Sequence, residues 1–313
     1  MSRACLSGLA TAVVLVVAVG ASALPSQWEQ RTPLPLARTE VAAATFGNEV
    51  AIVGGFTADG VPSARVDVYS PARDRWRRLP DLPVTVHHAM AAGSARQLYV
   101  FGGYGEDGRP RRAAFVFDDG RWRALPLLPF PRAAAGAAVV HGRIVVAGGV
   151  VRVNGERLAR SALSLDLRSR RWSLIPGPTP RELLGVAALG GAVYAVAGRL
   201  SGLDTNLATF EAWRPGAKRW TSLPPVPKPR GGTGAVGVAS RLVSVGGEKP
   251  GGTIEEVYAY RTAVRLWERL PDLPTPRHGL GVAALGGRIF VIGGGPQPGL
   301  TVSAANETFA VGG

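Results

Sequence analysis

Six tryptophans recur along the chain at nearly constant intervals, and this spacing limits the folds that the chain can adopt. They are separated by 48, 46, 50, 48 and 47 residues, at Trp28, Trp76, Trp122, Trp172, Trp220 and Trp267. Prolines and glycines interrupt every window that is long enough to hold a helix. A repeat of this length with one tryptophan per unit is typical of propellers. The sequence therefore predicts an all-β fold.

Each unit divides into four predicted strands. The first follows a Pro-Arg turn, as at residues 133–140 and 280–284, and a tight turn joins it to the second. The second strands are apolar throughout, which indicates burial on both faces, and they cover residues 50–53, 99–101, 144–147, 193–196, 242–245 and 289–292. A glycine pair follows each of them except in the fourth unit, which has Ala197-Gly198. We expect neighbouring backbones to lie too close for a Cβ atom there.

The third strand carries a large apolar side chain before the tryptophan, and Trp213 fills this place in the fourth unit as a packing residue. The glycine pair, this residue and the tryptophan at their spacing resemble the Kelch repeat over residues 28–313. The resemblance implies a β-propeller of blades with four antiparallel strands around a central channel. The units add up to six blades. The last is expected to close with residues 28–31 as outer strand beside residues 306–311.

The N-terminus has the pattern of a secretory signal peptide over residues 1–23. Arg3 precedes an uncharged apolar run at residues 6–19, and Ala21-Ser22-Ala23 is a cleavage motif. An uncleaved anchor is the alternative. The sequence predicts a secreted or periplasmic protein, with residues 24–313 as a single, monomeric propeller and no later membrane span. Cys5 is the only cysteine, so the mature chain has no thiol.

The chain is strongly basic, with a formal net charge of +14. The basic residues are spread over every repeat instead of forming one stripe, so no specific nucleic-acid partner is indicated. The excess charge predicts weak, salt-sensitive attraction to anionic polymers or headgroups.

An arginine stands at the predicted start of the innermost strand in five of the six units: Arg38, Arg132, Arg181, Arg230 and Arg277. The second unit has Val86, His87 and His88 there instead. A ring of guanidinium groups at a channel mouth would suit an anionic ligand. The alternative is that each arginine bonds to loop carbonyls and braces its own blade. Strand parity puts the arginines on the same face as the long, uneven loops, with His87, Glu182, Glu248 and His278 at the rim of the site.

The sequence gives no convincing catalytic or metal site. His87 and His88 are adjacent on a predicted strand and are expected to point to opposite faces, so they would not share an ion. The copper site of galactose oxidase, another Kelch-type protein, needs a cysteine that the mature chain lacks. We therefore predict a non-catalytic module, without metal or cofactor, that binds an anionic protein or carbohydrate. The alternative is a cofactor-free sugar epimerase or mutarotase similar to N-acetylneuraminate epimerase, with Glu182 or Glu248 as general base.

Overall fold

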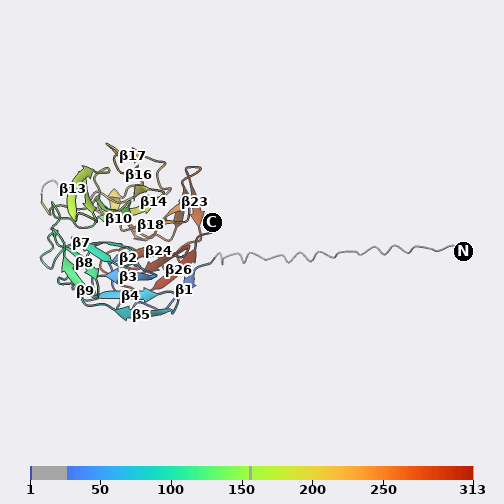
Figure 1. Ribbon diagram of the computed structural model, residues 1–313, viewed down its shortest axis with the longest axis horizontal. Coiled ribbons are helices and arrows are strands. Elements are labelled where there is room, and N and C mark those ends of the chain that lie inside the picture. The colour runs from blue at the N-terminus through green and yellow to red at the C-terminus, as the bar shows by residue number, and fades with distance from the viewer. Residues whose placement is uncertain (2–26, 155–156, 313) are drawn as a thin grey trace.

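The computed structural model describes residue 1, residues 27–154 and residues 157–312 of the chain. Six four-stranded antiparallel sheets surround a central channel, with the first strand of each sheet innermost and the fourth outermost (Figure 1). The predicted six-bladed propeller is confirmed. Apart from Met1, the predicted signal peptide lies outside the described residues and stays a prediction. In the described part of the chain, no helix is long and apolar enough to cross a membrane.

The blades follow one another along the chain. Blade one holds β2 (Ala42–Phe46), β3 (Glu49–Val53), β4 (Val66–Ser70) and β5 (Arg75–Arg78). Blade two holds β6 (Met90–Gly93), β7 (Leu98–Phe101), β8 (Ala114–Asp118) and β9 (Arg121–Ala124). Blade three holds β10 (Gly136–Val140), β11 (Arg143–Ala147), β12 (Ser161–Asp166) and β13 (Arg171–Pro176).

Blade four holds β14 (Gly185–Leu189), β15 (Ala192–Val196), β16 (Phe210–Trp213) and β17 (Thr221–Ser222). Blade five holds β18 (Gly234–Val238), β19 (Arg241–Val245), β22 (Val257–Arg261) and β23 (Leu266–Leu270). Blade six holds β24 (Gly281–Leu285), β25 (Arg288–Ile292), β26 (Asn306–Ala310) and β1 (Glu29–Gln30). Loops add a small hairpin, β20 (Glu248–Lys249) with β21 (Gly252–Thr253), and a 3-10 turn, η1 (Leu203–Thr205).

The ring of blades closes as the count of predicted strands implies, with the N-terminal strand completing the last blade. Strand β1 pairs antiparallel with β26, placing Glu29 opposite Thr308 and Gln30 opposite Glu307. The Trp28 ring packs against Phe309 at a centroid distance of 5.4 Å. The N-terminal strand therefore covers the edge of the last blade that would otherwise be open.

The recurring tryptophans join neighbouring blades. Each indole nitrogen donates a hydrogen bond of 2.8–3.0 Å to a backbone carbonyl at or just beyond the end of the outer strand of the preceding blade: Trp28 to Pro271, Trp76 to Thr32, Trp122 to Pro80, Trp172 to Pro126, Trp220 to Pro176 and Trp267 to Pro224. A buried or half-buried indole N–H needs such an acceptor. Each repeat has one tryptophan because each blade makes one such hydrogen bond to the preceding blade.

The second strands form the core, as the sequence predicts. Val50, Ile52 and Val53 are fully buried in blade one, and Ile289, Val291 and Ile292 are fully buried in blade six. The glycine pairs lie where backbones crowd. A Cβ on Gly55 would lie 2.5 Å from the carbonyl oxygen of Thr39, and both Gly54 and Gly55 have positive φ. In blade four, Ala197 takes the first place of the pair at φ 54°.

The innermost strands begin four residues after the predicted Pro-Arg position, so the expectation that the arginines start these strands is wrong. A residue with positive φ breaks the extended chain two residues after that position in every blade: Glu40, His88, Ala134, Leu183, Gly232 and Gly279. Backbone N–H···O=C hydrogen bonds of 2.8–3.2 Å link these residues from each blade to the next. The N–H of Val41 completes the ring by donating to the carbonyl of Gly279. The channel mouth is therefore encircled by a ring of peptide hydrogen bonds that fixes each blade to the next.

Candidate functional site

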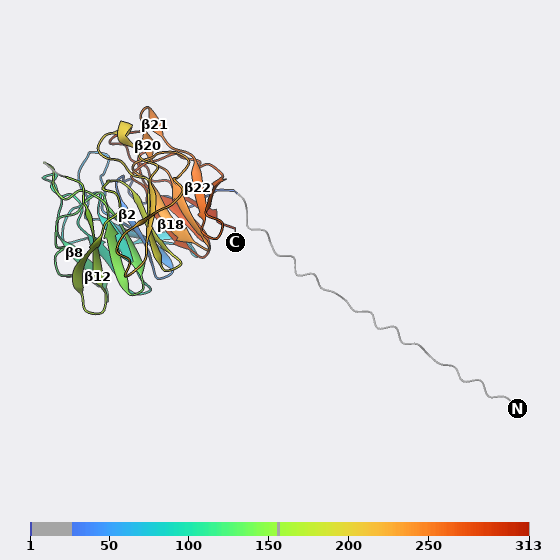
Figure 2. The same cartoon turned by 90° about the horizontal axis from the view of Figure 1, so that it is seen from above.

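One face of the propeller carries all the long loops. The loops between second and third strands and those between blades emerge there, and hairpin β20–β21 projects from this loop face (Figure 2). The opposite face, called here the turn face, carries the tight turns between first and second strands. Uneven loops on a rigid scaffold are the usual place for binding residues.

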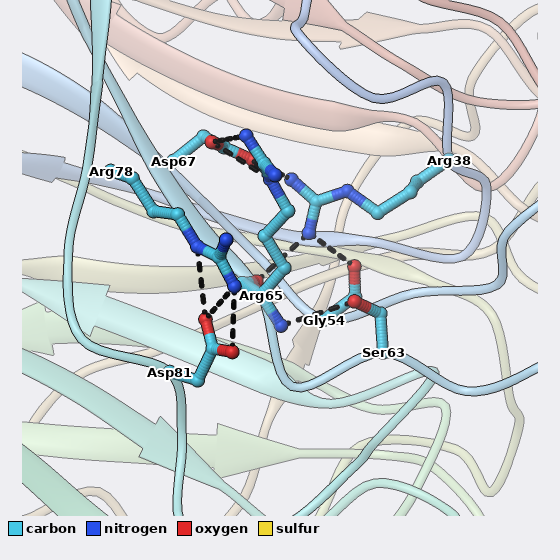
Figure 3. Close-up of polar contacts among 7 residues, drawn as sticks. All are labelled: Arg38, Gly54, Ser63, Arg65, Asp67, Arg78 and Asp81. Atoms are coloured by element: carbon cyan, nitrogen blue, oxygen red, sulfur yellow. Dashed lines mark hydrogen bonds and ion pairs between the residues drawn. The ribbon is translucent and has the colours of Figure 1, made fainter.

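The five predicted arginines lie beneath the loop face and are 0–1% exposed. Each donates to the carbonyl of the residue that closes the second strand of its own blade, sixteen positions later: Gly54, Gly148, Ala197, Gly246 and Gly293. Figure 3 shows the first case, in which the Arg38 guanidinium also bonds to the carbonyl of Arg65 and to the carboxylate of Asp67. These contacts are those of the bracing alternative, because no guanidinium faces solvent.

A carboxylate on the third strand neutralises three of these arginines. Arg38 pairs with Asp67 at 2.5 Å, Arg181 with Glu211 at 2.5 Å, and Arg277 with Glu307 at 2.6 Å. Blade three has Arg132 with Leu163 at the corresponding place, and its guanidinium bonds only to the carbonyls of Gly148 and Ser161 among described residues. Burial lowers the pKa of Arg132 to about 10.

The two remaining blades complete this pattern. In blade five, the Arg230 guanidinium lies 5.2 Å from the centre of the Tyr258 ring. Blade two has lost both partners, with Val86 in place of the arginine and Phe115 in place of the acid. Because blade two lacks both the arginine and the acid, we assign these two positions to the interior of the blade. The anion-binding ring of arginines, predicted as one of two alternatives, therefore has no accessible guanidinium groups to form it.

The rim of the channel mouth, above the arginines, is built from six β-bridges, one per blade. In each bridge the residue after the arginine position meets the residue after the glycine pair: Thr39–Phe56, His87–Tyr104, Ala133–Val150, Glu182–Arg199, Gly231–Glu248 and His278–Gly295. The four predicted rim residues, His87, Glu182, Glu248 and His278, all occupy these positions. Unlike the arginines, the side chains at these positions differ from blade to blade.

Seven rim residues form a chain of alternating charge, called here the rim ion chain. It runs from His88 to Glu40 (3.0 Å), on to His278 (3.2 Å) and then to Glu248 (3.7 Å). Arg199 continues it, 2.8 Å from Glu248 and 3.7 Å from Glu182. Arg157 ends it, 2.5 Å from Glu182. The chain includes residues from all six blades, and it holds each carboxylate between two potential cations.

The predicted orientation of the two adjacent histidines is wrong. His88 has φ 51°, so the chain is not a regular strand at this point and the two rings turn to the same side. Their Nδ1 atoms lie 2.7 Å apart. His87 also stacks between two aromatic rings, with Phe56 at a centroid distance of 3.8 Å and Tyr104 at 5.2 Å.

The charges at the rim follow from burial and contacts. Burial, followed by the charge of His88, lowers the pKa of His87 to about 3, so this ring is neutral at pH 7. Burial alone would raise the pKa of Glu40, but His88 and His278 hold it well below its usual range. Burial alone would lower the pKa of His278, but Glu40 and Glu248 raise it. The Nε2 atom of His278 also faces the carbonyls of Gln297 and Gly299, which favours the imidazolium.

Sequence reasoning missed Glu40, His88, Arg157 and Arg199 as members of the rim ion chain. A signal for Arg199 was present, because it follows Ala197-Gly198 as Glu248 follows its glycine pair. Arg157 lies inside a variable loop and no repeat position identifies it. Within the described ranges, no group of three or more histidine, cysteine, aspartate or glutamate side chains is arranged to hold a metal ion.

Exposed apolar side chains gather on the loop face. Eight large apolar residues of its loops are at least 37% exposed: Leu36, Val61, Val84, Leu127, Phe130, Val153, Leu200 and Leu300. Elsewhere in residues 27–154 and 157–312, only Leu174, Val264 and Leu266 belong to this class. Most of the exposed large apolar side chains in the described part of the chain therefore belong to loops of this face.

Comparisons with known proteins agree with this geometry. The family described as Kelch motif matches residues 37–83, 131–179 and 180–227, which cover most of blades one, three and four. This chain is a Kelch-repeat propeller. The repeats that escape the family match include blade two, in which Val86 and Phe115 replace the arginine and its acid.

Relatives among curated proteins also carry Kelch names. Kelch domain-containing protein 8B of Homo sapiens is 32% identical over 148 residues, which are 44% of this chain and 42% of that protein. Kelch-like protein terF of Aspergillus terreus is 28% identical over 135 residues, 41% of this chain and 29% of that protein. Kelch repeat and BTB domain-containing protein 13 of Homo sapiens is 30% identical over 128 residues, 40% and 27% respectively. The chain thus spans less than half the length of these relatives.

Proposed function

We propose that this propeller is a non-catalytic interaction module and that a protein partner docks on its loop face, over the channel mouth. The observation that carries the proposal is that loops of the face bearing the rim ion chain hold eight of the eleven exposed large apolar side chains among residues 27–154 and 157–312. Apolar anchors form the core of a protein interface, and polar and charged groups lie at its rim. Because the sequence predicts a signal peptide, we also propose that docking takes place outside the cytoplasm.

The rim favours a protein over a small anion or a glycan. The buried arginines offer no cationic ring, and Arg157 and Arg199 already pair with Glu182 and Glu248. The two candidate general bases of the epimerase alternative are likewise engaged in ion pairs, Glu182 with Arg157 and Arg199 and Glu248 with Arg199 and His278.

A peptide selected from a random phage-displayed library provides a defined probe for this face. We expect hydrogen exchange in the complex to slow in loops 56–65, 199–206 and 295–302. The Leu300→Ser change should weaken binding about tenfold, because the loss of an apolar anchor from an interface costs more than about 1 kcal/mol. Val264→Ser is the matched control: Val264 is 49% exposed and Leu300 is 53% exposed, but Val264 lies in a hairpin turn of blade five.

Two outcomes would contradict the proposal. One is a footprint confined to the tight turns of the opposite face. The other is equal loss of binding in the Leu300→Ser and Val264→Ser proteins.

A further inference from the structure

A cavity lies between blades four and five, away from the loop face. It has a volume of about 340 Å³ and is lined by Tyr194, Arg214, Arg219, Tyr260 and Arg265, among others. No carboxylate is among its lining residues. The three arginines are exposed, whereas Tyr260 is 2% exposed at the base of the pocket.

The pocket lies beside the short outer strand of blade four. Strand β17 has two residues, as has β1 in blade six, whereas β5, β9, β13 and β23 have four to six. Trp213 occupies the third-strand aromatic position, and its indole nitrogen donates to the carbonyl of Ala217 at 2.9 Å. This bond holds the loop between β16 and β17 away from a regular hairpin, so that Arg214 and Arg219 flank the opening.

The hydroxyl group of Tyr260 is buried and has no hydrogen-bond partner among the described residues. Tyr69 is the corresponding residue of blade one, since each tyrosine stands opposite the tryptophan of its own blade. The Tyr69 hydroxyl donates to the carboxylate of Asp74 and accepts a bond of 3.1 Å from Arg31. A buried phenol needs such an acceptor, because an unmade hydrogen bond costs free energy.

In blade five, both partners of the hydroxyl have been replaced. Arg265 stands five residues after Tyr260, as Asp74 stands five residues after Tyr69, and both have positive φ (58° and 47°). Leu223 follows Trp220 by three residues, as Arg31 follows Trp28. The acceptor carboxylate of blade one is therefore missing in blade five, and a cation occupies its position in the chain.

Within residues 27–154 and 157–312, no acidic side chain pairs with the three arginines of this pocket. Arg214 donates one bond, of 3.0 Å, to the carbonyl of Gly190. No ion pair joins Arg219 or Arg265 to any described acidic residue. The nearest acidic side chain on the adjoining strand, Glu268, pairs with Arg241 at 3.1 Å. Three guanidinium groups and one free phenol thus surround a space without an anion of its own.

We propose that this pocket binds a small anionic group, a carboxylate, sulfate or phosphate, in the position that the Asp74 carboxylate holds in blade one. The Tyr260 hydroxyl donates to the anion, and Arg265, Arg219 and Arg214 supply charge-assisted bonds. The apolar walls formed by Ala192, Ala212 and Leu223 leave room for a short organic body beside the anionic head.

Calorimetric titration with acetate, sulfate and inorganic phosphate, at constant ionic strength and against chloride, tests this site in the full chain. We expect saturable binding of at least one of the three anions, and the tightest identifies the head group. The Arg265→Asp change places a carboxylate near Tyr260 at the position that Asp74 holds in blade one. It should weaken anion binding more than about tenfold.

Arg170→Asp is the matched control, because Arg170 holds the same hairpin position in blade three at φ 55° but belongs to a blade with Leu165 in place of the tyrosine. It makes the same change in net charge and should leave anion affinity within about twofold. Tyr260→Phe should weaken binding several-fold while leaving the melting temperature without anion unchanged, since no existing bond is lost.

Absence of saturable binding by all three anions would overturn the proposal. So would an equal loss of affinity in the Arg265→Asp and Arg170→Asp proteins, because that result indicates attraction by net charge alone.

Discussion

Two layers of charge meet at the loop-face end of the channel, and they differ in how they repeat. The lower layer consists of the buried arginines. They recur in five blades, and each bonds to the carbonyl at the equivalent position of its own blade. The upper layer, the rim ion chain, has no residue that recurs in this way: glutamate, histidine and arginine take its places in different blades. Repetition in five of the six blades indicates a role in stabilising the blade itself, whereas variation at equivalent positions marks what one blade contributes to a site.

Breaking the lower layer at a paired arginine should give the largest effect. Arg277→Met leaves the Glu307 carboxylate buried with only neutral partners, Gln30 and Thr275. We expect urea denaturation to show a loss of about 3–5 kcal/mol in the free energy of unfolding. The paired change Arg277→Met with Glu307→Leu imitates the apolar blade two and should recover part of that loss. A single variant as stable as the unaltered protein would contradict the bracing role.

Removing the strand that closes the ring should have the next largest effect. A chain that begins after residue 31 lacks β1, the Trp28 bond to Pro271 and the cover over Phe309. We expect its thermal transition to fall by roughly 5–10 °C relative to a chain that begins at residue 27, as loss of a few kcal/mol would produce in a domain of this size. Equal melting temperatures would show that the edge of β26 needs no partner.

The upper layer should respond to pH with a smaller change in stability. The pKa of Glu40 is lowered on folding, so its contribution is present above its ordinary value of 4.5 and is lost as the pH falls through the folded-state pKa. The pKa of His278 is raised, so its contribution is complete below its ordinary value of 6.5 and is lost as the pH rises through the folded-state pKa. The rim therefore stabilises the ring most between these two values.

His278→Gln is the variant that isolates the alkaline side of this dependence. Melting curves between pH 5 and pH 9 should show a decline in the unaltered protein above about pH 6.5 that is smaller in the variant. Parallel curves for the two proteins would mean that the Glu40–His278–Glu248 contacts contribute nothing to stability.

Much of the fold could be predicted because its signals are local and repeated. The tryptophan interval predicts the blades, and the position of Trp28 relative to Trp267 predicts the closure of the ring. The role of the arginines was left open because a sequence shows that Arg277 recurs with Arg181 but not that Glu307 reaches it from the third strand. His88 was misplaced because nothing in its sequence neighbourhood indicates a positive φ. Arg157 and Glu40 join the rim through contacts between blades, which no spacing within one unit reveals.

The central claim is that the repeated arginines stabilise the blades and that the rim binds the partner. The dissociation constant of the selected peptide, measured for Arg132→Met and for Arg199→Ala at a temperature where both proteins are folded, tests it most directly. Arg132 has two carbonyl partners and no exposed atoms to offer a ligand. The claim predicts affinity within about twofold of the unaltered protein for Arg132→Met, and at least about tenfold weaker binding for Arg199→Ala. Weaker binding in Arg132→Met with unchanged binding in Arg199→Ala would contradict it.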